Sequence, residues 1–245
     1  MKQTRVDTVA NLLVDAGNFA PQTTNRADSL KLHVLLDFYR TQKYDALTLS
    51  TREVQLGLKP WIQNRDSLPI VVANLFPGNG GPKPLFKPYV IRQDRGRKIG
   101  VIGFVSESAW KARRDTTLDA TVQPPVAMGK LIRKVAKKTD YLTVLGDFTF
   151  GEADSLAAHY PEIDLIVSSG IKSADHPRQI KNTVIIGSAT RGNFANYIDF
   201  STDPADTAHF HPFAQTLDES VPVDSSVLKY VTHVNEAMKA KTGQH

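Results

Sequence analysis

Apolar and polar residues alternate along this chain with two different periods. From Ala27 to Gln42 the apolar residues recur at helical spacing, which predicts an amphipathic helix. Elsewhere, short apolar runs end at glycine, asparagine or aspartate, which is typical of buried strands. The predicted helices are Lys2–Ala10, Ala27–Gln42, Leu58–Arg65, Pro124–Thr139, Gly151–His159 and Val223–Lys241. The predicted strands are Asn11–Val14, Tyr44–Leu49, Leu68–Ala73, Pro88–Arg92, Lys98–Phe104, Asp140–Gly146, Ile163–Ser168, Thr183–Ser188, Ala195–Ser201 and Thr207–Phe213.

The order of these elements predicts the fold class. Strands alternate with helices through the first two-thirds of the chain, which favours parallel strands joined by crossover helices. Paired strands dominate the last third, which favours a mixed or antiparallel edge. Phe76–Pro88 is rich in proline and glycine and predicts an irregular connection, and Ser106–Val122 shows no clear pattern. We therefore expect a single layered α/β domain over residues 1–245.

Composition excludes several chemistries. The 245 residues include no cysteine, which rules out disulfides, thiolate metal ligands and cysteine nucleophiles. No run approaches the ~20 apolar residues of a membrane-spanning helix, so no membrane span is expected. Met1–Arg5 shows no signal peptide.

The chain is basic, with a formal net charge of +5 and a pI near 9.3. Its cations cluster at Arg92–Lys98, Lys111–Arg114 and Lys130–Lys138. Such clusters attract nucleic acid, anionic lipid or acidic partners, but they are more often solvated faces, and that is our interpretation here. Aromatic residues are not interleaved with the charges, so nucleic acid is not the expected partner.

The stretch Asn11–Phe19 carries the first candidate chemistry. Its apolar run is followed by Asp15, Gly17 and Asn18, which indicates a strand that stops at a tight loop. In open α/β sheets, ligands and metals collect at such strand ends.

Taken together, the segments from about Ala10 to Lys239 resemble the 5′-nucleotidase branch of the calcineurin-like metallophosphoesterases. The similar segments, in chain order, are LLVDAGNF, YDALTLSTREVQLG, PIVVANL, KPYVI, KIGVIGF, YLTVLGDF, IDLIVSSGIKS and VIIGSATRGNFANYIDF. The resemblance implies a four-layer α/β/β/α sandwich of the metallo-dependent phosphatase type, with mixed sheets and a metal site at the strand ends. It also implies a periplasmic or extracellular location.

The resemblance implies five metal-binding motifs, and this sequence alters each of them. No aspartate-x-histidine motif exists in Met1–Ala10, so the opening strand of the family is expected to be missing. Asn18 stands where the family has a bridging aspartate. Thr51 replaces a ligand asparagine, and Arg52 replaces the histidine that protonates the leaving group. Glu53 is retained from the same motif.

The last two motifs lose their histidines. Asp147 stands where the family has a histidine after an apolar strand, and Ser169–Lys172 replaces a glycine-histidine-x-histidine motif. Lys172 would place a positive charge where a metal cation should lie. The remaining weak metal candidates are Asn18, Asp147 and His176.

The altered motifs leave two interpretations of the strand-end site. In the first, the residues repack with their own ion pairs, for example Arg52 or Lys172 with Asp147. In the second, Asn18, Thr51, Arg52, Asp147 and Lys172 form an anion or small-ligand site, because guanidinium, ammonium and hydroxyl groups suit phosphate or carboxylate.

Two functional hypotheses follow from the resemblance. The favoured one is a catalytically degenerate 5′-nucleotidase-like domain, a pseudoenzyme without a cofactor that serves as a binding or structural module. Its partner would be an anionic small molecule or another protein. The alternative is a phosphoester (nucleotide) hydrolase that holds divalent manganese, zinc or iron with replacement ligands. The C-terminal nucleoside-binding domain of such nucleotidases is not expected in residues 1–245.

Overall fold

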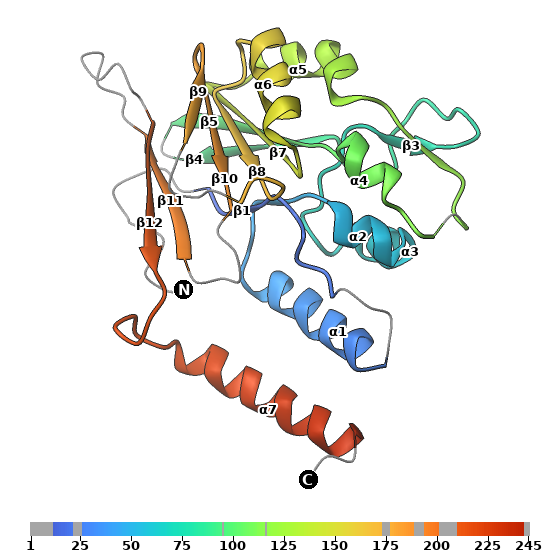
Figure 1. Cartoon of the computed structure of the whole chain (residues 1–245), viewed down its shortest axis with the longest axis vertical. Helices are drawn as coiled ribbons and strands as arrows, with labels where there is room; N and C mark the ends of the chain where they lie inside the picture. The colour runs from blue at the N-terminus through green and yellow to red at the C-terminus, as the bar shows by residue number, and fades with distance from the viewer. Residues whose placement is uncertain are drawn as a thin grey trace.

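The computed structural model describes residues 12–21, 26–94, 96–115, 117–172, 177–188, 194–200 and 210–242. It is a mixed α/β fold with several sheets (Figure 1). The largest sheet has six strands in the order β4-β5-β7-β8-β10-β9. Its inner strands β5, β7, β8 and β10 are parallel, and the edge strands β4 and β9 are antiparallel to their neighbours. The bounds are β4 Tyr89–Asp94, β5 Arg97–Gly103, β7 Tyr141–Gly146, β8 Leu165–Ser168, β9 Arg178–Ile180 and β10 Thr183–Gly187.

Both faces of this sheet are covered, which explains why its inner strands are almost continuously apolar. On one face Val144 and Ile166 pack with Ile132 of α5 (Gly129–Ala136) and Leu156 of α6 (Phe150–His159). A 3₁₀ turn, Pro125–Met128, leads directly into α5. Figure 1 shows both helices on this side of the sheet.

The opposite face is covered by shorter β elements. Val101 and Leu145 of the large sheet pack with Val14 and Ala46 of a parallel pair, β1 (Val14–Asp15) and β2 (Ala46–Leu47). Ile198 packs farther along this face, beside β8 and β10. It lies in the antiparallel pair β11 (Phe194–Phe200) and β12 (Phe210–Thr216). A third antiparallel pair joins β3 (Leu75–Pro77) to β6 (Ala120–Val122).

Helices pack beyond the short β elements around fully buried Trp61. They are α1 (Arg26–Thr41), α2 (Thr51–Leu56), α3 (Lys59–Asn64) and α4 (Glu107–Lys111). The last helix, α7 (Ser225–Thr242), lies against α1, where the Tyr230 hydroxyl donates to the Val34 carbonyl at 3.2 Å. The second β layer consists of separate two-stranded pairs, so the regular four-layer α/β/β/α sandwich stays a prediction.

Most predicted elements are present, with several differences. β3 enters the stretch Phe76–Pro88 that was predicted to be irregular, and α2 was not among the predicted helices. Leu68–Ala73 is not a strand, because successive amides donate to different segments: Val71 to Leu47, Val72 to Lys87 and Ala73 to Gly103. Ser106–Val122 contains α4 and β6, and β9 was not predicted. The predicted helix Lys2–Ala10 lies outside the described residues. None of the described helices combines the length and apolarity needed to cross a membrane.

Gly103 is required where the large sheet meets the neighbouring segment. A methyl group at this position would overlap the carbonyl oxygen of Val71 and the hydroxyl of Thr48. We expect Gly103→Ala to lower the free energy of unfolding by about 2–3 kcal/mol, because backbone atoms must move to relieve the overlap. The matched control is Gly151→Ala in α6, where a methyl group meets open space. The control should be neutral or stabilising by up to about 1 kcal/mol. Urea unfolding of both variants checks this, and equal effects would contradict it.

Candidate functional site

The candidate site lies where the carboxyl ends of several strands meet. The segments that follow β1, β2, β5, β7 and β8 supply Asn18, Thr51, Ser106, Asp147 and Ser169. Hydrogen bonds link these five side chains into one network. The fold therefore brings together segments that are far apart in the sequence, at the edge of the sheet where α/β proteins bind ligands.

The loop after β1 contains two residues in the left-handed backbone region. Gly17 has φ of 93° and Asn18 has φ of 65°, and glycine and asparagine adopt this left-handed region at the lowest cost. Asp15 supports the loop, because its Oδ1 accepts from the Gly17 amide at 2.8 Å and its Oδ2 accepts from the Tyr39 hydroxyl at 2.6 Å. Burial raises the pKa of Asp15, although both hydrogen bonds oppose the shift.

Glu53 fixes the same loop against α2. Its carboxylate is fully buried and accepts from three backbone amides: Ala20 at 2.7 Å, Asn18 at 2.9 Å and Ser50 at 2.9 Å. Burial raises the pKa of Glu53 to about 7, with the three amides acting in the opposite direction. Both Glu53 oxygens therefore point at the protein's own backbone.

Asp147 is the centre of the network. It is buried, and its Oδ2 accepts from the Thr51 amide at 2.9 Å and from the Thr51 hydroxyl. The same oxygen lies 3.4 Å from the Asn18 side-chain nitrogen. Its Oδ1 accepts from the Ser106 hydroxyl at 3.0 Å. Asp147 thus joins the ends of four separate segments with one carboxylate.

Asn18 extends the network toward β8. Its side-chain nitrogen also donates to the Ser169 hydroxyl at 3.1 Å, and its side-chain oxygen accepts from the Arg52 amide at 3.3 Å. The hydroxyls of Ser169 and Ser50 both donate to the Ala16 carbonyl, at 2.9 and 2.7 Å. The Asn18 amide group is therefore engaged at both ends.

The two cations of the site lie at its edge and not in its centre. The Arg52 guanidinium donates to the Asn18 carbonyl at 3.3 Å, and the Lys172 ammonium donates to the Ser169 carbonyl at 3.0 Å. Among the described residues, neither cation forms an ion pair with Asp147. The expected Arg52–Asp147 or Lys172–Asp147 ion pair is therefore wrong. The Asp147 carboxylate accepts from hydroxyl and amide donors instead.

The donor set does not fit a pair of divalent cations. Manganese, zinc and iron need oxygen or nitrogen lone pairs directed at a common point. Here both oxygens of Asp147, the Asn18 side-chain oxygen and both oxygens of Glu53 are directed at protein donors. No cluster of three or more histidine, aspartate or glutamate residues suited to a metal occurs within the described ranges. His176, the third metal candidate, lies outside those ranges.

The sequence pattern identified Asn18, Thr51 and Asp147 but missed the serine hydroxyls. Ser106 ends the apolar run of β5 and begins α4, where its hydroxyl accepts from the Ala109 amide at 3.0 Å. A serine between a strand and a helix is an N-cap signal, which was present in the sequence and not used. Ser50 carried an even stronger signal, because Ser50-Thr51-Arg52-Glu53 is a capping box at the start of α2. Ser169 had no comparable local signal.

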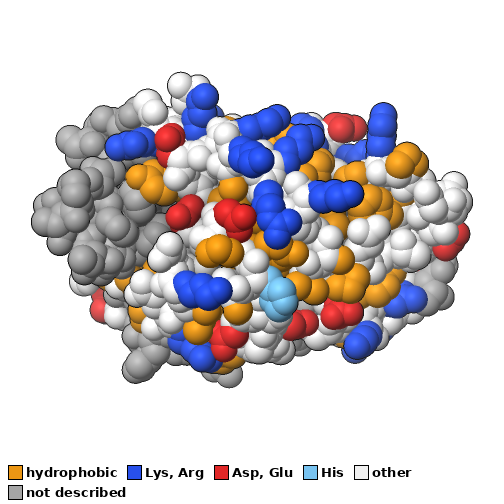
Figure 2. Space-filling view, turned by 90° about the horizontal axis from the view of Figure 1, so that it is seen from above, with side chains coloured by type: hydrophobic (Ala, Val, Ile, Leu, Met, Phe, Trp, Pro, Cys, Tyr) orange, Lys and Arg blue, Asp and Glu red, His pale blue; other side chains and the backbone are white. Residues whose placement is uncertain are grey.

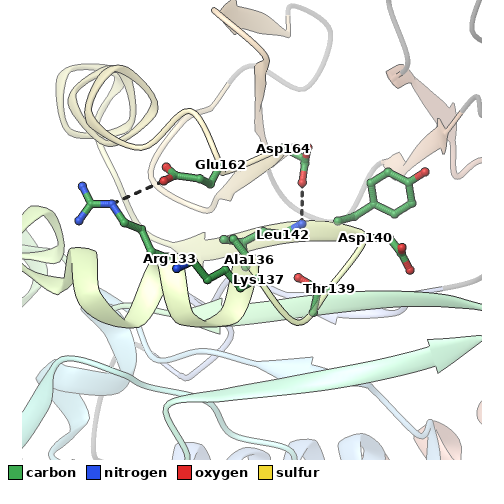
Figure 3. Close-up of a pocket in the computed structure, with 9 residues that line it drawn as sticks. Arg133, Ala136, Lys137, Thr139, Asp140, Leu142, Glu162 and Asp164 are labelled. Carbon is green, nitrogen blue, oxygen red and sulfur yellow. Dashed lines mark hydrogen bonds and ion pairs between the residues drawn. The ribbon is translucent and has the colours of Figure 1, made fainter.

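A separate cavity of about 370 Å³ lies at the opposite end of the sheet. Figure 3 shows Arg133 of α5 on one side of it and Glu162 and Asp164, near the start of β8, on the other. None of the strand-end network residues lines this cavity, so the two sites are distinct.

Comparison with solved structures shows the fold. Scans of the sequence against protein-family models and against curated proteins find no match. The calcineurin-like phosphoesterase YfkN from Bacillus subtilis is similar over 95% of this chain and 85% of its own, with a TM-score of 0.77 and 19% identity. The sulfate thiohydrolase SoxB from Thermus thermophilus covers 96% of this chain with a TM-score of 0.80 and 16% identity. A 5′-nucleotidase precursor, also from Thermus thermophilus, covers 94%, with a TM-score of 0.76 and 19% identity.

The chain thus has the fold of 5′-nucleotidases and calcineurin-like phosphoesterases, as the sequence resemblance implied. It spans only 43% of the SoxB chain and 50% of the Thermus nucleotidase chain. Identities below a fifth show the fold and leave the activity open to proposal.

The raised pKa of Glu53 predicts a pH dependence of stability. The folded state holds the Glu53 proton more tightly than the unfolded chain, whose glutamate has an ordinary pKa of 4.5. The stabilisation is therefore complete below pH 4.5 and is lost as the pH rises to about 7. We expect the wild type to lose on the order of 3 kcal/mol relative to Glu53→Gln across this window, because the glutamine does not titrate. Urea unfolding at several pH values measures the difference, and parallel curves for the two proteins would refute it.

The role of Asp147 predicts a large loss of stability on truncation. Asp147→Ala removes the acceptor of the Thr51 amide and of the Ser106 hydroxyl, and one of the two acceptors of the Asn18 side-chain nitrogen, so we expect a loss of about 3 kcal/mol. Asp154→Ala is the matched control, because Asp154 makes a partly exposed ion pair with Arg178 at 3.0 Å. The control should cost less than about 1 kcal/mol. Similar urea midpoints for the two variants would argue against a central role for Asp147.

Proposed function

We propose that this chain is a non-catalytic domain of the metallophosphoesterase-like fold that serves as a binding or structural module. The observation that carries the proposal is the Asp147 network, in which the protein itself occupies the lone pairs that a metal-dependent hydrolase would need. In such hydrolases a metal ion lowers the pKa of a bound water and holds the phosphate oxygens. The residues at these strand ends do not support that chemistry.

Proton transfer to a leaving group is also unsupported. Arg52 stands at the position that the resemblance assigns to a histidine acid. A guanidinium does not release its proton in proteins. Glu53 is the other acid of that motif, but three backbone amides enclose its carboxylate. Neither residue is placed to act as a general acid.

The edge of the site retains features that suit an anion. Arg52 and Lys172 each make one hydrogen bond within the described residues, and a guanidinium has five N–H groups and an ammonium three. The remaining donors suit a phosphate or carboxylate, either on a small molecule or on the surface of another protein. A location outside the cytoplasm, which the resemblance implies, is part of the same proposal.

Metal loading combined with a phosphatase assay tests the proposal. We expect the chain, incubated with manganese, zinc or ferrous iron and then desalted, to retain substoichiometric metal. It should also hydrolyse p-nitrophenyl phosphate no faster than buffer containing the same metal. Near two retained ions per chain together with turnover would establish the alternative, a hydrolase with replacement ligands.

Inorganic phosphate is the probe for the anion site. Saturating phosphate should raise the melting temperature of the wild type and leave that of Arg52→Gln/Lys172→Gln unchanged. An equal rise in both proteins would show that the two cations do not form the site. This measurement does not depend on metal, so it separates binding from catalysis.

A further inference from the structure

The outer face of α5 carries a stripe of lysines. Four exposed lysines recur at positions i, i+4, i+7 and i+8 along α5 and the turn that follows it. We call them the α5 lysines: Lys130, Lys134, Lys137 and Lys138. The opposite face of the helix is buried through Ile132 and Val135. Seen from above, Lys and Arg side chains gather on the side of the molecule where α5 and α6 lie (Figure 2).

Nearby acids do not neutralise this stripe. No aspartate or glutamate occurs in residues 120–139, and the α5 lysines form no ion pair with any residue in the described ranges. Three carboxylates line the cavity of Figure 3, and each has another partner. Asp140, two residues after Lys138, accepts from the Lys98 amide at 2.7 Å. Glu162 pairs with the guanidinium of Arg133 at 3.5 Å, and Asp164 accepts from the Leu142 amide at 2.7 Å.

The arrangement is unfavourable for the isolated helix. Lys130 and Lys134 are like charges four residues apart within α5, and such pairs destabilise helices; Lys137 and Lys138 follow its last residue, Ala136. The lysines therefore do not stabilise α5 through their mutual spacing. A surface of opposite charge would remove the repulsion.

The chemistry of the stripe identifies the kind of surface. Single-stranded nucleic acid is bound by stacking on aromatic side chains, and none is exposed on α5. Protein interfaces are anchored by buried aromatic or apolar residues, and none of the exposed large hydrophobic side chains lies on α5. The guanidinium of Arg133 is already held by Glu162 and lies over the Tyr160 ring. The exposed side of α5 therefore presents mainly ammonium groups, and its buried side packs against the sheet.

We propose that the α5 lysines form a docking surface for an anionic phospholipid bilayer, which the chain binds peripherally through headgroup charge. Clusters of basic residues on one face of an amphipathic helix are attracted to such surfaces, with each lysine contributing about fivefold in affinity. The chain then lies with α5 toward the membrane and the strand-end site elsewhere on its surface. This proposal does not depend on the absence of catalysis.

Vesicle cosedimentation tests the proposal with the whole chain. The probes are phosphatidylcholine vesicles with and without about 30% phosphatidylglycerol, at ~0.05 M and ~0.5 M salt. Wild-type chain should bind only the anionic vesicles and only at low salt. The variant K130Q/K134Q/K137Q/K138Q should bind at least about 100-fold more weakly. Glutamine keeps the helix propensity, and the loss of repulsion should leave the unfolding midpoint unchanged or slightly raised.

The matched control removes four exposed lysines elsewhere, in the variant K59Q/K83Q/K87Q/K111Q. It has the same net charge as the α5 variant and should keep its affinity for anionic vesicles within about threefold of wild type. Equal loss in the two variants would mean that net charge alone drives binding, which overturns the proposal. Absence of wild-type binding at low salt, or binding that persists at high salt, would overturn it too.

A titration with duplex DNA distinguishes lipid phosphate from nucleic-acid phosphate as the ligand of the α5 lysines. Duplex DNA is titrated at the same phosphate concentration and low salt as the vesicles. Weaker binding to the duplex than to the anionic vesicles supports the lipid surface. Tighter binding to the duplex would assign the stripe to nucleic acid and overturn the proposal.

Discussion

The architecture of the strand-end site depends on the buried carboxylate of Glu53. It accepts three backbone amides, from Asn18, Ala20 and Ser50, and so holds the loop after β1 against the start of α2. Its own carbonyl accepts from the Trp61 indole at 2.9 Å, which ties this point to the core. A buried carboxylate is costly unless donors surround it, and here they do. With the loop fixed in this way, Asn18 and Thr51 are positioned to reach Asp147.

The polar side chains at the strand ends bond to one another. Hydrogen bonds link Asp147, Asn18, Thr51, Ser106 and Ser169, so side chains connect the strand ends directly. Such networks specify a unique arrangement when every member is satisfied. The described side chains with a buried polar atom that lacks a hydrogen-bond partner are those of Arg92, Asp154 and Glu162, and all lie outside this network. The polar groups at the strand ends are therefore used by the protein for its own structure.

Local sequence patterns predicted the elements well and the site only partly. The helix period of Ala27–Gln42 and the apolar strand before Asp147 depend on neighbouring residues, so they are visible in the sequence. The contacts of Asp147 with Thr51 and Ser106 depend on how the strands are ordered in space, which no local pattern encodes. Opposite charge predicted Arg52 or Lys172 as the partner of Asp147, but Thr51 is its partner in the structure. The Thr51 amide lies in the first turn of α2, where amides have no acceptor within the helix. It is therefore a fixed donor that costs less to order than the long side chains of Arg52 or Lys172.

The two ends of the large sheet differ in how their charges are satisfied. At the carboxyl ends of the strands, the carboxylates of Glu53 and Asp147 are enclosed by amide and hydroxyl donors. At the other end, the α5 lysines lie exposed and lack ion pairs within the described residues, and the Lys130–Lys134 spacing weakens their own helix. Charge that is already paired gains little from a partner, because desolvation offsets the new contact. Unpaired charge on an exposed face keeps its long-range attraction for a partner of opposite charge. The two ends of the sheet therefore differ in kind: the protein's own donors enclose the carboxylates at one end, and the α5 lysines at the other keep their charge exposed.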